Sequence, residues 1–132
     1  MIVKNAGEIL SHGNVEGRRI AIDIIDYAIS QIDNYRLVRR TVRLEGDRLH
    51  VRGLTFDLSK VGNIYVVGGG KGSFSIARGL EEILGDRISG GIVIEKRGES
   101  RRLRRIRIVE AGHPVPDEDG LKAAGEVVRI AK

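Results

Sequence analysis

An apolar, β-branched run that breaks into a cluster of glycines constrains the fold of this chain more than any other feature. Residues 64–67 are Ile, Tyr, Val and Val, residues 68–72 hold four glycines and Lys71, and apolar residues recur at helical spacing from Ser73 onward. This order predicts a buried strand, a tight loop and a helix, which is how α/β proteins build anion sites. We therefore expect this loop to be part of the functional site.

The predicted loop offers an anion both backbone and side-chain groups. Glycines let amide N–H groups approach a phosphate or carboxylate closely, and the N-terminus of the next helix adds partial positive charge. Lys71 adds a full charge and is the candidate catalytic residue. The other candidate anion-binding residues of the loop are Gly68, Gly69, Gly70, Gly72 and Ser73.

The loop matches neither of the two common glycine-rich patterns. A P-loop places its lysine after the last glycine, whereas Lys71 precedes Gly72 and Ser73. The dinucleotide pattern G-x-G-x-x-G fails because a serine stands at its third glycine. A turn that binds no ligand is the alternative interpretation, but such a turn has no use for a cation.

Length and composition favour a single domain of 132 residues in a reducing compartment. There is no cysteine, which excludes disulfides and cysteine-based chemistry, and the three histidines have no metal-ligand spacing. No apolar run approaches the length of a membrane span. We expect a soluble, cytoplasmic protein without a metal site of its own, and the charge-rich composition would also suit a thermophile.

The net charge of +5 comes largely from one short segment. It contains Lys96, Arg97, Arg101, Arg102, Arg104, Arg105 and Arg107. A nucleic-acid surface is one interpretation, but the segment lacks interleaved aromatic residues and any recognised binding motif. We expect a solvated edge or a surface for another domain, and no nucleic acid.

Periodicity along the chain predicts an α/β fold. Asn14 would cap a helix with a packed face of Ala21, Ile24, Ile25, Ala28 and Ile32, and a β-hairpin and a short extended piece would span residues 42–58. Fully buried strands are expected at 63–67, 91–95 and 106–109. Ser73 or Ser75 would cap a second helix and Asp117 a final one, which has Leu121, Ala124, Val127, Val128 and Ile130 on its apolar side. We predict a Rossmann-like three-layer α/β/α fold with a mostly parallel sheet, plus the N-terminal helix and hairpin.

Both special loops leave strands at the same end of this predicted sheet. One is residues 68–73, and the other is residues 110–117, where His113 could donate a hydrogen bond or move a proton and Asp117 is expected to cap a helix. Ligands of such sheets bind beyond the carboxyl ends of the strands. Three parallel strands leave an exposed edge, so a partner chain, a second copy or a missing C-terminal portion should complete the structure.

Three stretches together resemble the N-terminal part of the glycerate 2-kinase family, whose members are also labelled hydroxypyruvate reductase. They are residues 66–72, residues 77–91 and the motif Gly112-His113-Pro114-Val115-Pro116-Asp117, preceded by Glu110 and Ala111. Residues 11–14 and 36–40 fit the same family, so the resemblance covers nearly the whole chain. The resemblance implies that residues 1–132 are a single domain equivalent to the N-terminal part of such a kinase, without its C-terminal domain.

The resemblance implies transfer of a phosphoryl group from ATP, with Mg²⁺, to the 2-hydroxyl of D-glycerate in a cleft between two domains. Lys71 would neutralise charge on the glycerate carboxylate or the phosphoryl group, residues 68–72 would cradle an anion and His113 would line the cleft. The imperfect dinucleotide pattern argues against a nicotinamide-dependent reductase. Because family members are about three times longer, this chain alone should bind weakly and catalyse poorly, unless a partner chain or homo-oligomer completes it.

Two other classes of function stay open at this stage. A phosphosugar-binding module of the sugar-isomerase type also combines a glycine loop with a serine-rich helix, which Ser73 and Ser75 would suit. A non-catalytic interaction subunit would use the arginine segment instead.

Overall fold

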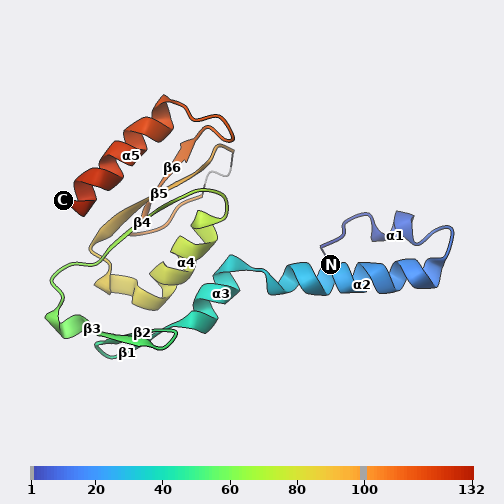
Figure 1. Ribbon diagram of the computed structural model, residues 1–132, viewed down its shortest axis with the longest axis horizontal. Coiled ribbons are helices and arrows are strands. Elements are labelled where there is room, and N and C mark those ends of the chain that lie inside the picture. The colour runs from blue at the N-terminus through green and yellow to red at the C-terminus, as the bar shows by residue number, and fades with distance from the viewer. Residues whose placement is uncertain (1, 99–100) are drawn as a thin grey trace.

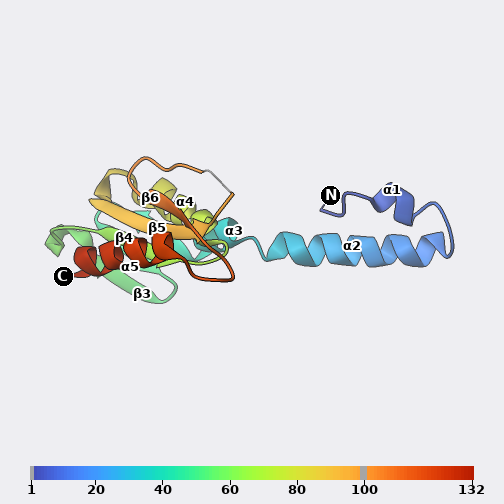
Figure 2. The same cartoon turned by 90° about the horizontal axis from the view of Figure 1, so that it is seen from above.

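The computed structural model describes residues 2–98 and 101–132 as a body with a helical arm (Figure 1). The arm consists of α1 (Ala6–Ile9) and α2 (Val15–Gln31), and two perpendicular views show α2 running away from the body (Figure 2). The body holds two three-stranded sheets and the remaining helices. Among the described residues, none of the helices combines the length and the apolar character that crossing a membrane requires.

The sheet that carries the glycine loop is parallel. Its strands β4 (Tyr65–Gly69), β5 (Gly90–Lys96) and β6 (Arg107–Ala111) lie in the order β4-β5-β6. Helix α4 (Ser73–Leu84) covers one face and α5 (Glu118–Ala131) covers the other (Figure 1). The prediction of a Rossmann-like three-layer arrangement is therefore confirmed.

The second sheet is antiparallel and precedes the first in the chain. Its strands β1 (Val42–Glu45), β2 (Arg48–Val51) and β3 (Leu54–Asp57) pair in sequence order, so the predicted hairpin gains the extended piece as a third strand. Helix α3 (Asn34–Thr41), which periodicity did not predict, packs with β1 against α4. Short 3-10 turns, Leu58–Lys60 (η1) and Gly85–Arg87 (η2), lead into β4 and out of α4.

The main core lies between the parallel sheet and α4. Burial of aliphatic side chains drives this packing. Its buried members are Leu58, Val66, Ala77, Leu84, Ile88, Val93 and Ile106. The core therefore fixes β4 and α4 against each other, and with them the loop that joins the two.

Local signals set most helix ends. The Asn14 side chain accepts a hydrogen bond from the Gly17 amide at 3.0 Å, and Asp117 accepts one from the Gly120 amide at 3.0 Å, as predicted. Gly85 ends α4 with a φ of +51°. The predicted serine cap of α4 is wrong, because Gly72 occupies the N-cap in the left-handed conformation and no side chain caps this helix.

Three predicted burial patterns are wrong. In β4 only one face is buried, since Tyr65 and Val67 are 50% and 45% exposed. The predicted packed face of α2, which is Ala21, Ile24, Ile25, Ala28 and Ile32, is exposed, and Ile22 is buried in its place. On α5, Ala123 is buried, whereas Leu121, Ala124 and Val128 of the predicted apolar side are exposed. The apolar residues were identified correctly, but the described part of the chain leaves much of these faces exposed.

Candidate functional site

The glycine loop is a tight turn with Lys71 at its tip. The Ser73 amide and hydroxyl both donate to the Gly70 carbonyl oxygen, at 3.2 and 2.6 Å. Gly70 and Gly72 have φ values of +108° and +82°, a region that side chains other than glycine rarely adopt. The loop therefore needs glycine at both positions, and its fold leaves the Lys71 side chain exposed.

Several positive groups of this turn are directed to solvent. No described residue forms an ion pair or hydrogen bond with the Lys71 ammonium. The Ser73 amide donates to Gly70, but because no side chain caps α4, the following amides of its first turn lack a partner within the helix and can donate to an anion. Gly70 is different, since its amide already donates to the Ile94 carbonyl at 2.9 Å.

The second loop is held by Asp117. This carboxylate accepts hydrogen bonds from the Gly112 amide at 2.8 Å and from the Arg97 guanidinium at 2.7 Å, besides capping α5. A Cβ at residue 112 would come within 2.6 Å of the Val115 carbonyl oxygen, so only glycine fits there. These hydrogen bonds hold the loop so that His113 lies exposed just after the carboxyl end of β6.

The two loops meet at the carboxyl ends of the strands. Gly70 and Lys71 share a cavity of about 70 Å³ with His113, and the cavity is completed by Ile94, Glu95, Lys96, Ala111 and Gly112. Gly68, Gly69 and Ser73 instead line a hollow of about 210 Å³ between β4 and α4. The structure thus brings three of the predicted site residues together and places the other glycines of β4 and Ser73 beside them, at the edge of the sheet.

Sequence reasoning missed the residues that end β5. Glu95 is only 5% exposed and lines the cavity between the two loops together with Lys96. Arg97 follows and binds both Asp117 and Asp119. A usable signal was present, because the charged residues 95–97 directly follow an apolar strand that lies between the two special loops. Lys96 and Arg97 are instead part of the predicted basic segment.

The Ser73 hydroxyl donates to the backbone of its own loop, and this removes the main support for a phosphosugar-binding module. It donates to the Gly70 carbonyl and lies 3.3 Å from the Ile94 carbonyl oxygen. A hydroxyl has one proton to donate, and here the loop backbone takes it. Its role in ligand binding remains a prediction.

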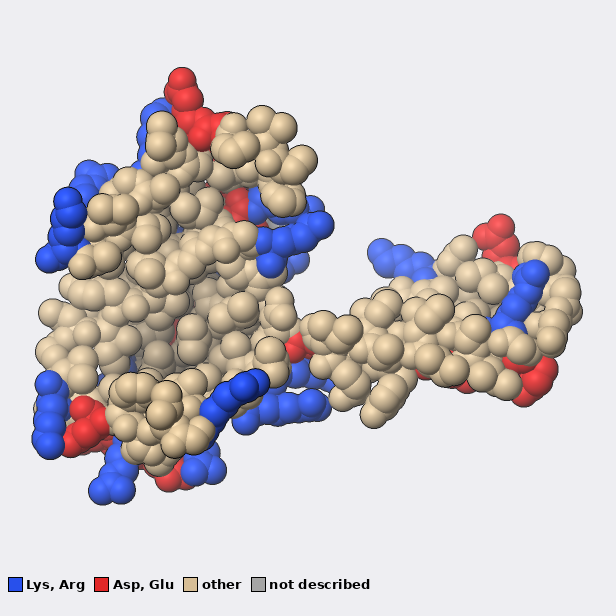
Figure 3. All heavy atoms as spheres, viewed as in Figure 1, with Lys and Arg blue, Asp and Glu red and all other residues tan. Residues whose placement is uncertain are grey.

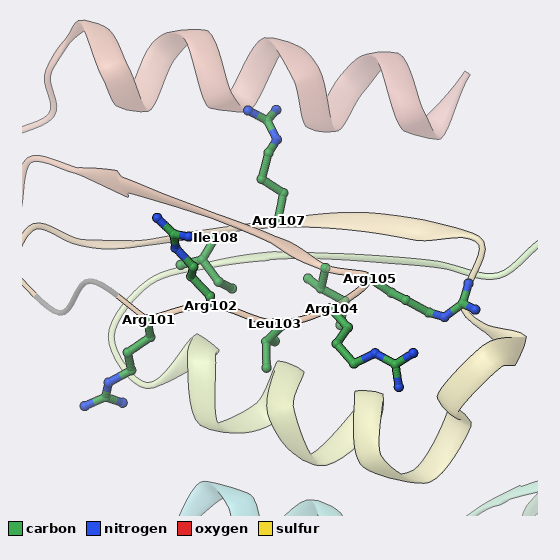
Figure 4. A pocket seen from close by; sticks show the side chains of 8 residues that line it. Arg101, Arg102, Leu103, Arg104, Arg105, Arg107 and Ile108 are labelled. Atoms are coloured by element: carbon green, nitrogen blue, oxygen red, sulfur yellow. The ribbon is translucent and has the colours of Figure 1, made fainter.

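The arginine segment does not form one free basic surface. Arg105 pairs with Asp86, Arg107 pairs with Glu126, and Arg101 stacks over the Phe74 ring at 4.9 Å. In Figure 4, Arg107 points to α5 and Leu103 points to α4, on either side of a cavity of about 350 Å³. Figure 3 likewise shows positive side chains spread over the body, beside several acidic ones.

Backbone amides and an arginine depress the pKa of Asp117. Hydrogen bonds from the Gly120 and Gly112 amides, and then from Arg97, lower it from 3.8 to about 2. A carboxyl group whose pKa is lower in the folded than in the unfolded state stabilises the fold above pH 3.8. That stabilisation is lost as the pH falls from 3.8 towards 2, because the carboxylate becomes protonated.

We expect Asp117→Asn to remove this part of the acid sensitivity. The variant should be less stable than the native chain at pH 7, and its free energy of unfolding should change less between pH 4 and pH 2. Urea unfolding at a series of pH values measures both. Asp119→Asn is the control, since Asp119 shares Arg97 but binds neither loop amide among the described residues. Equal pH dependence of native chain and Asp117→Asn would contradict the assignment.

Comparisons with known proteins show which proteins this chain is similar to. The chain is 35% identical over 113 residues to the glycerate 2-kinase of Pyrococcus horikoshii, covering 86% of this chain and 25% of that protein. It is 30% identical over 115 residues to the D-glycerate 2-kinase of Thermotoga maritima, covering 86% and 24%. A match of 37% over 68 residues is to a putative hydroxypyruvate reductase of Agrobacterium vitis, covering 52% of this chain and 18% of that protein.

A solved structure and a family model complete the assignment. The crystal structure of a Pyrococcus horikoshii OT3 protein superposes with a TM-score of 0.70 at 35% identity, over 85% of this chain and 26% of that one. The chain therefore spans about a quarter of the length of the curated relatives it matches. Residues 20–132 match the family model described as Domain of unknown function (DUF4147). This chain belongs to the DUF4147 family.

Proposed function

We propose that this chain supplies the glycine-loop wall of a glycerate 2-kinase site, which transfers a phosphoryl group from ATP to the 2-hydroxyl of D-glycerate. The observation that supports this most is the shared cavity of Lys71 and His113 beside Glu95, at the end of the sheet where ligands of such folds bind. The names of the two similar glycerate 2-kinases support this reaction class.

Each residue has a role that its position allows. The exposed Lys71 ammonium neutralises charge on the glycerate carboxylate or on the transferring phosphoryl group. Amides of Gly72 and of the first turn of α4 hold an anion, and Gly68, Gly69, Gly70 and Ser73 shape the loop that presents them. His113 lines the cleft and donates a hydrogen bond. Phosphoryl transfer depends chiefly on such positioning and charge neutralisation.

The site is one wall of a cleft. A cavity of about 70 Å³ has room for two or three water molecules at about 30 Å³ each, far less than glycerate and a nucleotide need. In our proposal, residues 1–132 form the N-terminal domain of the kinase. A further domain, a partner chain or another copy supplies the opposite wall of the cleft. The completed enzyme would act in the cytoplasm. In the described part of the chain no three acidic or histidine side chains gather around a point that could hold a metal. In our proposal Mg²⁺ enters the completed site with ATP, since Mg²⁺ is usually bound by substrate phosphates together with one or two carboxylates.

The test is activity in a completed cleft. Residues 1–132 are fused to the part of the Pyrococcus horikoshii glycerate 2-kinase that follows its matching region, and the fusion is given ATP and D-glycerate. We expect 2-phosphoglycerate, whereas residues 1–132 alone should give little or none. Product that forms only from hydroxypyruvate and a reduced nicotinamide, or tighter binding of sugar phosphates than of glycerate and ATP, would contradict the proposal.

A further inference from the structure

The two edges of the parallel sheet differ in a way that identifies one of them as a site for another strand. At the β6 edge, the segment 101–105 and strand residues Arg107 and Ile108 line a common cavity (Figure 4). The Glu81 carboxylate fixes this segment by accepting hydrogen bonds from the amides of residues 104, 105 and 106, at 2.8, 2.8 and 3.1 Å. Charged side chains and a covering segment are the means by which proteins block a true edge.

The β4 edge has neither of these protections. Tyr65 and Val67 are half exposed on the face that α5 covers elsewhere, and Ile76 of α4 is 42% exposed on the other face. The hollow along this edge is lined by Val66, Val67, Gly68, Gly69, Ser73, Ile76, Ala77, Leu80 and Val93, with no charged residue. A strand with apolar surface on both of its faces is typical of the middle of a parallel sheet.

The backbone of β4 also has its outer hydrogen-bonding groups available. The Ile64 carbonyl accepts from the Ser89 amide and the Gly70 amide donates to the Ile94 carbonyl, so even-numbered residues face β5. Because backbone groups alternate along a strand, those of Tyr65, Val67 and Gly69 point away from β5. They form a row that a further strand can pair with.

The handedness of the connections indicates which part of the polypeptide supplies this further strand. Crossovers between parallel strands are right-handed in about 98% of cases. Helix α4 leads from β4 to β5 on one face, and α5 follows β6 on the opposite face while contacting β4 as well (Figure 1). If α5 leads from β6 into another parallel strand by a right-handed crossover, the chain must pass back over β5 and β4. The first open position for that strand is then beside β4.

We propose that the free edge of β4 takes a parallel strand from the polypeptide that follows α5 in the longer members of the family. The glycine loop then lies where the strand order reverses, which is where open α/β sheets bind ligands. The loop after the added strand faces residues 70–73 and supplies the opposite wall of the anion site. This inference does not depend on the glycerate kinase activity proposed above.

Residue-specific amide hydrogen exchange tests the pairing. In residues 1–132 alone, the amides of Tyr65, Val67 and Gly69 should exchange about 100-fold faster than those of Gly68 and Gly70. In the fusion with the following part of the Pyrococcus horikoshii enzyme, all five should be slow. Fast exchange at 65, 67 and 69 in a fusion that still protects Gly68 and Gly70 would overturn the proposal. Protection of these three amides in a dimer of residues 1–132 alone would overturn it too, in favour of a second copy.

A second experiment compares two matched variants and does not use the fusion. Residues 1–132 and the same Pyrococcus portion are co-expressed as separate chains, and capture of one by the other is measured. Tyr65→Lys with Val67→Lys should reduce capture at least tenfold. Leu54→Lys with Phe56→Lys is the control, since these residues are 63% and 47% exposed at the same spacing on the edge strand β3. Equal capture by both variants, or no capture by the native chain, would refute the assignment of the β4 edge.

Discussion

Replacing Lys71 with alanine should lower turnover of the completed kinase by about 100-fold or more, the scale seen when one group that stabilises developing charge is removed. The loop holds this side chain at the tip of a turn formed by the Gly70 carbonyl and Ser73. Its ammonium has no partner among the described residues, so its full charge is available to a ligand. The effect should fall mainly on kcat, because charge neutralisation matters most in the transition state.

Two further variants show whether charge at this position is what matters. Lys71→Arg should retain more activity than Lys71→Ala, since it keeps a cation with a different shape. Lys60→Ala removes a lysine that is paired only with Asp57 at 3.5 Å in the described residues and lies before β4, at the other end of the strand. It should leave turnover unchanged. Turnover of Lys71→Ala equal to that of the native fusion would remove Lys71 from the mechanism.

The parts of the fold that follow from local chemistry could be predicted. Asn14 and Asp117 cap helices because their side chains reach amides three residues ahead, which needs no tertiary information. The parallel strands and their order along the chain follow from short β-branched runs separated by turn residues. The serine cap was wrong because Gly72, already in a left-handed conformation, occupies the N-cap itself.

The parts that depend on distant neighbours could not be predicted. Helix α3 has a local cap in Asp33, but it buries only Val38, and this side chain packs where a Cβ on Gly79 would lie 3.0 Å away, so its packing depends on α4. Glu95 ends a strand that is predicted to be buried, but only the assembled sheet shows that this carboxylate lies between two loops. Periodicity likewise marked the apolar face of α2 but contains no information on what covers it.

Replacing Gly91 with alanine should destabilise the fold by about 3 kcal/mol or more. A Cβ at this position would come within 2.2 Å of the Val66 carbonyl oxygen and within 3.1 Å of two other Val66 backbone atoms. Backbone cannot rotate away as a side chain can, so β4 and β5 would have to separate where the two strands pair. Urea unfolding followed by circular dichroism measures the loss.

The neighbouring glycine provides the control. A Cβ on Gly90 would lie 3.8 Å from the Tyr65 ring carbons, an ordinary van der Waals contact. Gly90→Ala should therefore change the free energy of unfolding by less than about 1 kcal/mol. Because separation of β4 from β5 would also displace the glycine loop from Glu95, Gly91→Ala should cost activity in the completed kinase, whereas Gly90→Ala should not. Equal stability of the two variants would mean that β4 and β5 are not in the register described here, and the position of Lys71 over the cavity would then be wrong as well.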